Sequence, residues 1–158
     1  MRTRPGDGGR AGRALMPRLA IRRTVPYARE DVFDIVADVE RYPEFLPGCT
    51  SARILRRDGE RLWVEQSVGL SGLSWRFRTT ALLARPDRIE IGTREAPFAY
   101  LDQVWRFREP GPGTTEVELA VNYELRSSLL ETVASGLFDE GFRQSLAAFE
   151  RRIHERLG

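Results

Sequence analysis

Side chains that support nucleophilic or metal-based chemistry are scarce in this sequence. It contains one histidine, His154, and one cysteine, Cys49. A Ser-His-Asp or Cys-His arrangement needs a histidine, and His154 stands among charged residues near the chain end, where solvent exposure is expected. Metal sites built on histidine and cysteine are excluded for the same reason. A lone cysteine also excludes an intrachain disulfide, which fits a reducing compartment.

Lysine is absent, and no stretch approaches the roughly 20 apolar residues that cross a bilayer. The formal net charge is +2, from 25 basic and 23 acidic residues. Residues 1–15 hold four arginines and one aspartate, so 21 basic and 22 acidic residues remain in 16–158, a net charge of −1. A nucleic-acid-binding domain carries its positive charge on the folded part, so DNA binding is not expected.

The chain divides near residue 16. Residues 1–15 consist of glycine, arginine and small residues without apolar periodicity, so they are predicted to form a disordered basic arm. Apolar patterning begins directly after Met16, which makes Met16 an alternative start to Met1. Residues 16–158 have the length of one domain.

Changes of hydrophobic period predict the order of the elements. Alternation over 19–25, ended by Pro26, predicts a strand. Helical spacing from Val32 to Val39 predicts a helix, and prolines limit 41–47 to a short second helix or an irregular turn. Six alternating segments with short links then predict antiparallel strands with one apolar and one charged face. These segments are 51–57, 61–68, 75–83, 88–94, 101–108 and 117–125, with 70–74 expected as a loop.

The end of the chain is predicted to be one long amphipathic helix. Ser127 or Ser128 can cap it, and Glu131 is placed to complete a capping box with Ser128. An apolar stripe runs from Phe138 to Leu157. The expected fold is therefore α+β, in the order β-α-α-β6-α, with a curved seven-stranded antiparallel sheet around the long C-terminal helix.

This arrangement predicts an apolar cavity, because one helix cannot cover the inner face of a strongly curved sheet at close packing. The inward pattern is rich in rings that either line such a cavity or fill an ordinary core. These rings are Trp75, Phe77, Trp105, Phe107, Phe138 and Phe142. Of these, Trp105 is expected at the cavity floor, beneath the final helix.

Three polar side chains interrupt the inward apolar pattern: Gln66, Thr79 and Gln103. A buried polar group without a partner costs ~1–3 kcal/mol, so each needs a hydrogen bond. A ligand oxygen, an ordered water or a neighbouring backbone group would each supply it. The carboxylates of Asp34, Asp38 and Glu44 are expected near the pocket mouth, although acids on a helix surface are usually only solvated.

The segment Val25–Cys49, which contains Tyr42-Pro43-Glu44-Phe45-Leu46-Pro47, resembles the opening of the coenzyme Q-binding START-like family. That family includes mitochondrial coenzyme Q-binding proteins, the ribosome-association toxin RatA and polyketide cyclase/dehydrase-like proteins. Weaker matches at 96–101, 105–107 and 149–152 extend the similarity over nearly all of 17–158. The glycine- and serine-rich 68–75 segment and Ala96 depart from the family pattern.

The resemblance implies a helix-grip fold and a non-enzymatic protein without a cofactor, which binds ubiquinone or a similar isoprenoid lipid in support of respiratory electron transport. Phe45, Leu46 and Phe98 then join the candidate ligand-binding residues. A pocket of ~300–1,000 Å³ could not enclose a long isoprenoid tail. Leu70, Leu73 and the 42–47 segment are therefore expected to form an entrance lip that docks transiently on a membrane.

The expected location is the cytoplasm, or the periphery of the inner membrane. Two other functions stay open. A polyketide cyclase/dehydrase-like enzyme would use the same cavity and would need a carboxylate with a raised pKa. A RatA-like protein would act on the ribosome, with the arm at 1–15 supplying phosphate contacts.

Overall fold

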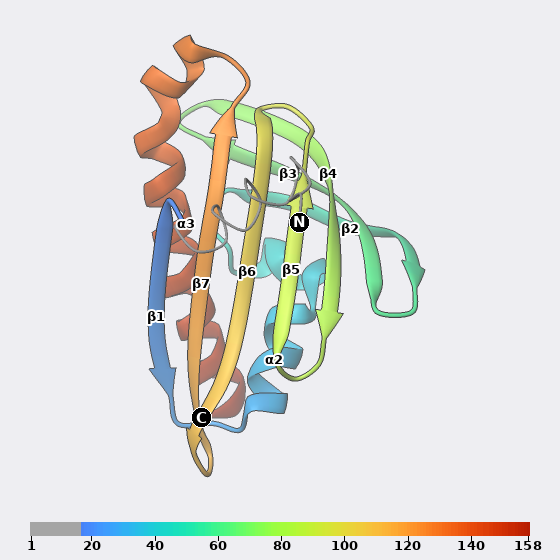
Figure 1. Ribbon diagram of the computed structural model, residues 1–158, viewed down its shortest axis with the longest axis vertical. Helices are drawn as coiled ribbons and strands as arrows, with labels where there is room; N and C mark the ends of the chain where they lie inside the picture. The colour runs from blue at the N-terminus through green and yellow to red at the C-terminus, as the bar shows by residue number, and fades with distance from the viewer. Residues whose placement is uncertain (1–16) are drawn as a thin grey trace, which may run out of the picture.

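The computed structural model describes residues 17–158, which form an antiparallel sheet of seven strands with helices on one face (Figure 1). The predicted arm at 1–15 and the Met16 alternative lie outside these residues. The elements are β1 (Leu19–Val25), α2 (Arg29–Ala37), the 3-10 helix η1 (Val39–Glu44), β2 (Cys49–Asp58), β3 (Arg61–Leu70), β4 (Leu73–Ala84), β5 (Arg88–Thr93), β6 (Phe98–Gly111), β7 (Thr114–Leu125) and α3 (Ser128–Leu157). This order confirms the predicted α+β helix-grip architecture.

The sheet order is β1-β7-β6-β5-β4-β3-β2, and every neighbouring pair is antiparallel. From β2 to β7, each strand pairs with the next strand along the chain, while β1 pairs with β7. In Figure 1, α2 and α3 lie behind the sheet, and β2 to β4 curve away from the plane of β1, β7 and β6. Trp105 on β6 lies opposite Leu119 and Ile89, in the interior of the sheet and beneath α3, as expected.

The expected loop at 70–74 is instead a tight hairpin turn. Leu70 pairs with Leu73, so only Ser71 and Gly72 lie outside the ladder. Both have positive φ, 49° and 81°, and glycine accepts this conformation without a steric cost. The serines and the glycine of this stretch predicted a loop. Local composition does not show which residues pair across strands, so the extension of both strands to Leu70 and Leu73 could not be predicted. Similarly, β6 begins at Phe98, three residues before the predicted Leu101.

Helix α3 is capped by Ser127, whose Oγ accepts a hydrogen bond from the Leu130 N–H at 3.0 Å. The predicted capping box of Ser128 with Glu131 is wrong, because the helix begins at Ser128 and Glu131 lies one position too far along. Glu131 instead accepts hydrogen bonds from the Leu125 N–H at 3.0 Å and from Arg18 at 2.8 Å. The carboxylate therefore ties the start of α3 to β7 and to the residue before β1.

No helix within 17–158 is both long and apolar enough to span a membrane. The inner face of the sheet and the helices share one core, which includes Phe33 of α2, Phe107 of β6 and Phe149 of α3. Arginines and carboxylates pair on the opposite face, as in Arg22 with Glu118 at 2.6 Å. One face of the sheet is therefore apolar and the other polar, as predicted.

Candidate functional site

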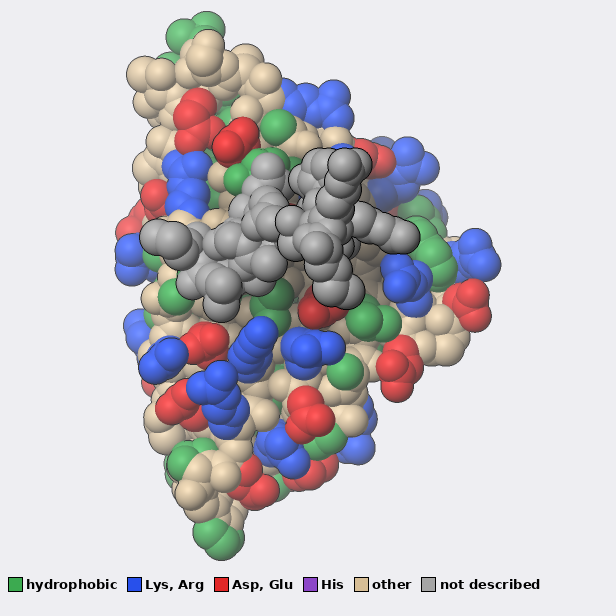
Figure 2. Space-filling model, viewed as in Figure 1, with side chains coloured by type: hydrophobic (Ala, Val, Ile, Leu, Met, Phe, Trp, Pro, Cys, Tyr) green, Lys and Arg blue, Asp and Glu red, His purple; other side chains and the backbone are tan. Residues whose placement is uncertain are grey.

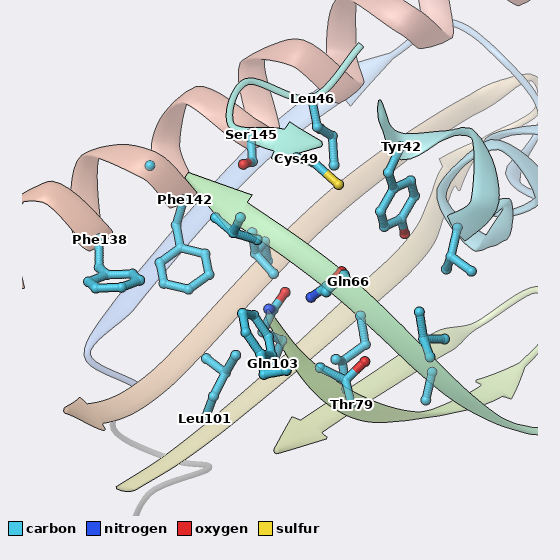
Figure 3. A pocket seen from close by; sticks show the side chains of 18 of the residues that line it. Tyr42, Leu46, Cys49, Gln66, Thr79, Leu101, Gln103, Phe138, Phe142 and Ser145 are labelled. Carbon is cyan, nitrogen blue, oxygen red and sulfur yellow. The ribbon is translucent and has the colours of Figure 1, made fainter. Parts of the chain in front are cut away.

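An apolar cavity of about 140 Å³ lies between the inner face of the sheet, the η1 segment and α3 (Figure 3). The strands β3, β4 and β6 supply every second residue to it, because alternate side chains point to one face of a sheet. Its lining is mainly apolar and consists of Val39, Tyr42, Leu46, Pro47, Cys49, Val64, Gln66, Val68, Leu70, Phe77, Thr79, Ala81, Ile91, Phe98, Leu101, Gln103, Trp105, Leu119, Phe138, Gly141, Phe142, Ser145 and Phe149.

Three polar side chains from different strands are part of the otherwise mainly apolar lining. Gln66 on β3 is paired with Phe77 on β4, and Thr79 follows two residues later on the same face. Gln103 on β6 approaches the cavity from the other side, and Figure 3 shows both glutamine amides extending into the same space. The structure thus brings together the three polar residues that interrupt the inward apolar pattern.

These three side chains share an unusual property: none of them hydrogen-bonds to another residue within 17–158. Among the described residues, the fully buried side-chain atoms without a hydrogen-bonding partner are Arg29 Nε and Trp105 Nε1, so the polar atoms of these three residues are not sealed in the core but face open space. Thr79 is only 4% exposed, so it is the most buried of the three residues. The arrangement offers two amides and one hydroxyl to an occupant of the cavity.

The η1 segment closes one side of the cavity. The Tyr42 hydroxyl donates a hydrogen bond to the Val36 carbonyl, and the Tyr42 ring packs edge-on against Phe149 of α3 at 5.2 Å between centroids. The chain then turns at Gly48, where φ is +79° and an added Cβ would lie 2.5 Å from the Gly69 oxygen. Only glycine permits this approach, which fastens the segment to the end of β3.

The ionisable groups in the lining are Tyr42 and Cys49. Burial raises the pKa of the Tyr42 hydroxyl far above its ordinary value. Burial also raises the pKa of the Cys49 thiol. Both groups are therefore neutral near neutral pH, so neither can serve as a general base there.

The carboxylates expected near the mouth lie outside the lining, where they form ion pairs. Asp34 pairs with Arg85 at 2.8 Å, Asp38 with Arg41 at 3.2 Å, and Glu44 with Arg152 at 2.9 Å. Within the described part of the chain, no group of three or more histidine, cysteine or acidic residues is placed to hold a metal ion. The lining therefore offers a ligand apolar contacts and neutral hydrogen-bonding groups.

Nine of the twelve residues predicted for the ligand site line the cavity: Leu46, Gln66, Phe77, Thr79, Phe98, Gln103, Trp105, Phe138 and Phe142. Three do not. Phe107 is in phase with Trp105 but lies further along β6, where it packs against Phe33 of α2 at 5.4 Å. Phe45 is outside the lining and packs against Phe149 and beneath the Arg152 guanidinium.

Trp75 is the third predicted residue outside the lining. It lies 5.4 Å from Phe138 between ring centroids and packs on that ring from the side of the β3–β4 turn. Sequence reasoning also missed several lining residues. Ser145 and Phe149 follow Phe142 at helical spacing on α3 and could have been found from periodicity. Cys49 and Val39 could not, because their places depend on the irregular path around η1.

The curved sheet, the long C-terminal helix and the apolar cavity between them define a helix-grip protein with an internal apolar site. Residues 25–150 match the family described as polyketide cyclase / dehydrase and lipid transport. Because this match covers most of the chain, the protein belongs to that family.

Two relatives and one solved structure are similar to the chain. The ribosome association toxin RatA of Pseudomonas aeruginosa is 31% identical over 134 residues, covering 85% of this chain and 93% of that protein. A mitochondrial coenzyme Q-binding protein (COQ10 homolog B) of Xenopus laevis is 29% identical over 135 residues, 82% of this chain and 55% of that protein. The structure of a START superfamily protein from Mycobacterium smegmatis superposes with a TM-score of 0.76 at 20% identity, covering 87% and 97% of the two chains. This last similarity shows the shared fold.

Proposed function

We propose that this protein binds the ring head group of ubiquinone, or of a similar isoprenoid lipid, inside the cavity, and that it does so without catalysis. The observation that carries the proposal is the set of three unpartnered polar side chains, Gln66, Thr79 and Gln103, in an otherwise apolar lining. A quinone ring presents apolar faces and two carbonyl oxygens, which accept hydrogen bonds from amide and hydroxyl donors. The coenzyme Q-binding relative supports this choice of ligand.

The size of the cavity favours a ring with its tail outside. An apolar cavity of roughly 150 Å³ binds one benzene molecule, and the present cavity measures about 140 Å³, so it has room for a six-membered ring whose substituents reach beyond it. An isoprenoid tail therefore needs a way out. The partly exposed lining residues Pro47, Leu70 and Phe142 mark that side of the cavity. Each tail carbon that stays against apolar surface contributes ~0.8 kcal/mol to binding.

Organic extraction of the purified full-length protein, followed by mass spectrometry, is the most direct test of this proposal. We expect a quinone or related isoprenoid lipid in stoichiometric amount. In parallel, titration with a short-chain ubiquinone should give saturable binding by calorimetry. The double variant Gln66→Leu/Gln103→Leu should bind more weakly. Protein that carries no lipid and shows no affinity for the added quinone would contradict the proposal.

The similarity to RatA favours ribosome association as a second candidate function. Residues 16–158 carry a net charge of −1, which does not favour contact with RNA, so this candidate ranks below lipid binding. Co-sedimentation with ribosomal subunits that persists after removal of residues 1–15 would support it. The family description also includes cyclases, but the ionisable groups of the lining, Tyr42 and Cys49, are both protonated near neutral pH, so the lining offers no general base. Polyketide synthase genes beside this gene would favour that activity.

A further inference from the structure

The cavity lining is free of charged side chains, although charge is common elsewhere in the protein. Charged residues make up 30% of the chain. Figure 2 shows arginines and acidic residues intermixed over the outer face of the sheet, on the side away from the helices. Among the described residues that line the cavity, by contrast, none is an aspartate, a glutamate, an arginine or a histidine. A ligand inside the cavity therefore meets no fixed charge of either sign.

The two ionisable residues of the lining do not supply a charge either. The Tyr42 hydroxyl donates a hydrogen bond to the Val36 carbonyl, and the Cys49 thiol donates to the Ser51 carbonyl at 3.7 Å. Burial raises the pKa of both groups, so both are uncharged near neutral pH. The other polar side chains of the lining are amides and hydroxyls, which are neutral hydrogen-bonding groups.

The arginines around the η1 segment lie outside the lining and already have an acidic partner. Arg152 donates to the Glu44 carboxylate at 2.9 Å, and Arg41 and Arg156 lie 3.2 and 3.9 Å from the same carboxylate. Arg143 of α3 is exposed and is also outside the lining. Within the described part of the chain, no arginine is therefore placed in the cavity wall to neutralise a bound anion.

An uncharged lining discriminates between neutral and anionic ligands. A carbonyl or hydroxyl oxygen that leaves water can regain hydrogen bonds from the amides of Gln66 and Gln103 and from the hydroxyl of Thr79. A carboxylate in the same space loses its hydration and gains no opposite charge, so it binds as the protonated acid instead. With an ordinary carboxyl pKa of about 4.3, roughly one molecule in 500 is protonated at neutral pH. The apparent affinity at neutral pH is reduced in the same proportion.

We infer that the cavity accepts ring lipids only in an uncharged form and rejects those that carry a carboxylate on the ring. The inference rests on the proposed function and deepens it, because it defines the chemical class of ligand at the same site. It also gives the protein a place in a reaction sequence. Where a ring lipid is built from an aromatic acid, a decarboxylation must come before binding, which releases the carboxyl group as CO₂ and puts a proton in its place on the ring.

Three ligands that share a prenylated phenol ring test this inference on the full-length protein by calorimetry. The first is the phenol itself, the second carries a carboxylate para to the hydroxyl, and the third carries a carboxamide in that position. The carboxamide matches the carboxylate in size and is neutral, so it separates charge from bulk. At neutral pH, we expect the carboxamide to bind within about tenfold of the phenol, and the carboxylate about a hundredfold or more weaker than the carboxamide. The affinity for the carboxylate should rise about tenfold for each unit by which the pH is lowered, down to about pH 5.

A cation placed in the lining should reverse this preference. In Gln103→Lys, an ammonium group takes the place of an amide, and we expect a gain of about tenfold or more in affinity for the carboxylate and no gain for the carboxamide. Gln144→Lys adds the same charge on the exposed surface of α3, outside the lining, and is the matched control. Thermal melts check that both variants are folded. If Gln103→Lys does not fold, the ligand series on the unaltered protein still decides the inference.

Equal affinity for the carboxylate and the carboxamide, without dependence on pH, would overturn the inference while binding of the phenol and of quinone persists. If neither quinone nor any of the three ligands binds, the proposed function is wrong, and the inference fails with it. Calorimetry with the full ligand series therefore separates a failure of the inference from a failure of the proposed function.

Discussion

The two ends of the inner sheet face follow the same alternation but are packed differently. At one end, Phe107 is 1% exposed and meets Phe33 of α2 edge-on, so both rings are part of the buried core. Toward the other end, Gln103 and Thr79 face a cavity bounded by η1 and α3. The difference follows from where the second helical layer lies: α2 covers one end, and the short η1 segment leaves the other incompletely filled.

This contrast explains why in-phase residues on one strand can differ in role. Trp105 and Phe107 are two residues apart on β6 and stack at 6.4 Å with nearly parallel rings. Trp105 borders the cavity and meets Phe149 of α3 at 4.9 Å, whereas Phe107 lies beyond it in the packed end. Alternation along a strand determines which side of the sheet a residue faces. The covering helices determine whether that side is core or cavity.

Phe107→Ala should have the largest effect on stability among the substitutions considered. Removal of a fully buried ring from the packed end leaves a void that the neighbouring Phe33 cannot fill. We expect a loss of ~3–5 kcal/mol in the free energy of unfolding, measured by urea denaturation. A loss below about 1 kcal/mol would show that the α2 end is loosely packed, and the contrast between the two ends would fail.

Trp105→Leu sharpens the comparison, because Phe107→Leu is its matched control two residues away. Both substitutions keep an apolar filler and remove a ring. We expect Trp105→Leu to cost less stability than Phe107→Leu, by about 1 kcal/mol, because the space beside Trp105 is already incompletely packed. Quinone affinity should fall about tenfold for Trp105→Leu alone. A Trp105→Leu protein that melts well below the parent yet holds quinone as tightly would identify Trp105 as a core residue.

Substitution of the cavity glutamines should separate binding from stability. Gln66→Leu and Gln103→Leu each remove an amide that has no hydrogen-bonding partner within the described residues. Stability should therefore stay within about 0.5 kcal/mol of the parent or rise. Quinone affinity should fall about fivefold to tenfold for each, by calorimetry. Gln144→Leu, on the surface of α3, is the control. Loss of more than about 2 kcal/mol of stability would mean that the amides stabilise the fold itself.

The sequence allowed the fold and most of the cavity to be predicted because both depend on periodicity. Gln66 and Gln103 stood out because each breaks an apolar alternation in a strand, and the strands formed as expected. Phe107 was misassigned because periodicity contains no information on which stretch of β6 α2 would cover. The outward position of Leu129 and Val133 was missed for a related reason: both fit an amphipathic helix, and only the packing of α3 shows that they are exposed.

The smallest effect is expected for Glu44, in the η1 segment beside the cavity, and concerns the stability of the fold at acidic pH. The hydrogen bond from Arg152 lowers the pKa of the exposed Glu44 carboxyl, and the nearby Arg41 and Arg156 contribute to the shift. Because the folded pKa lies below the unfolded one, the stabilisation is present above the unfolded pKa and is lost as pH falls through the folded pKa.

Glu44→Gln should therefore be slightly less stable than the parent near neutral pH, and this difference should vanish on acidification. The comparison uses urea denaturation across the carboxylate range, with Glu60→Gln as the control on the β2–β3 hairpin, and an NMR titration of Glu44 gives the pKa directly. If the ion pair also fixes the wall, quinone should dissociate faster from Glu44→Gln at neutral pH, while Glu60→Gln releases it as the parent does. A stability difference that persists at low pH would mean that Glu44 acts through packing and not through its ion pair with Arg152.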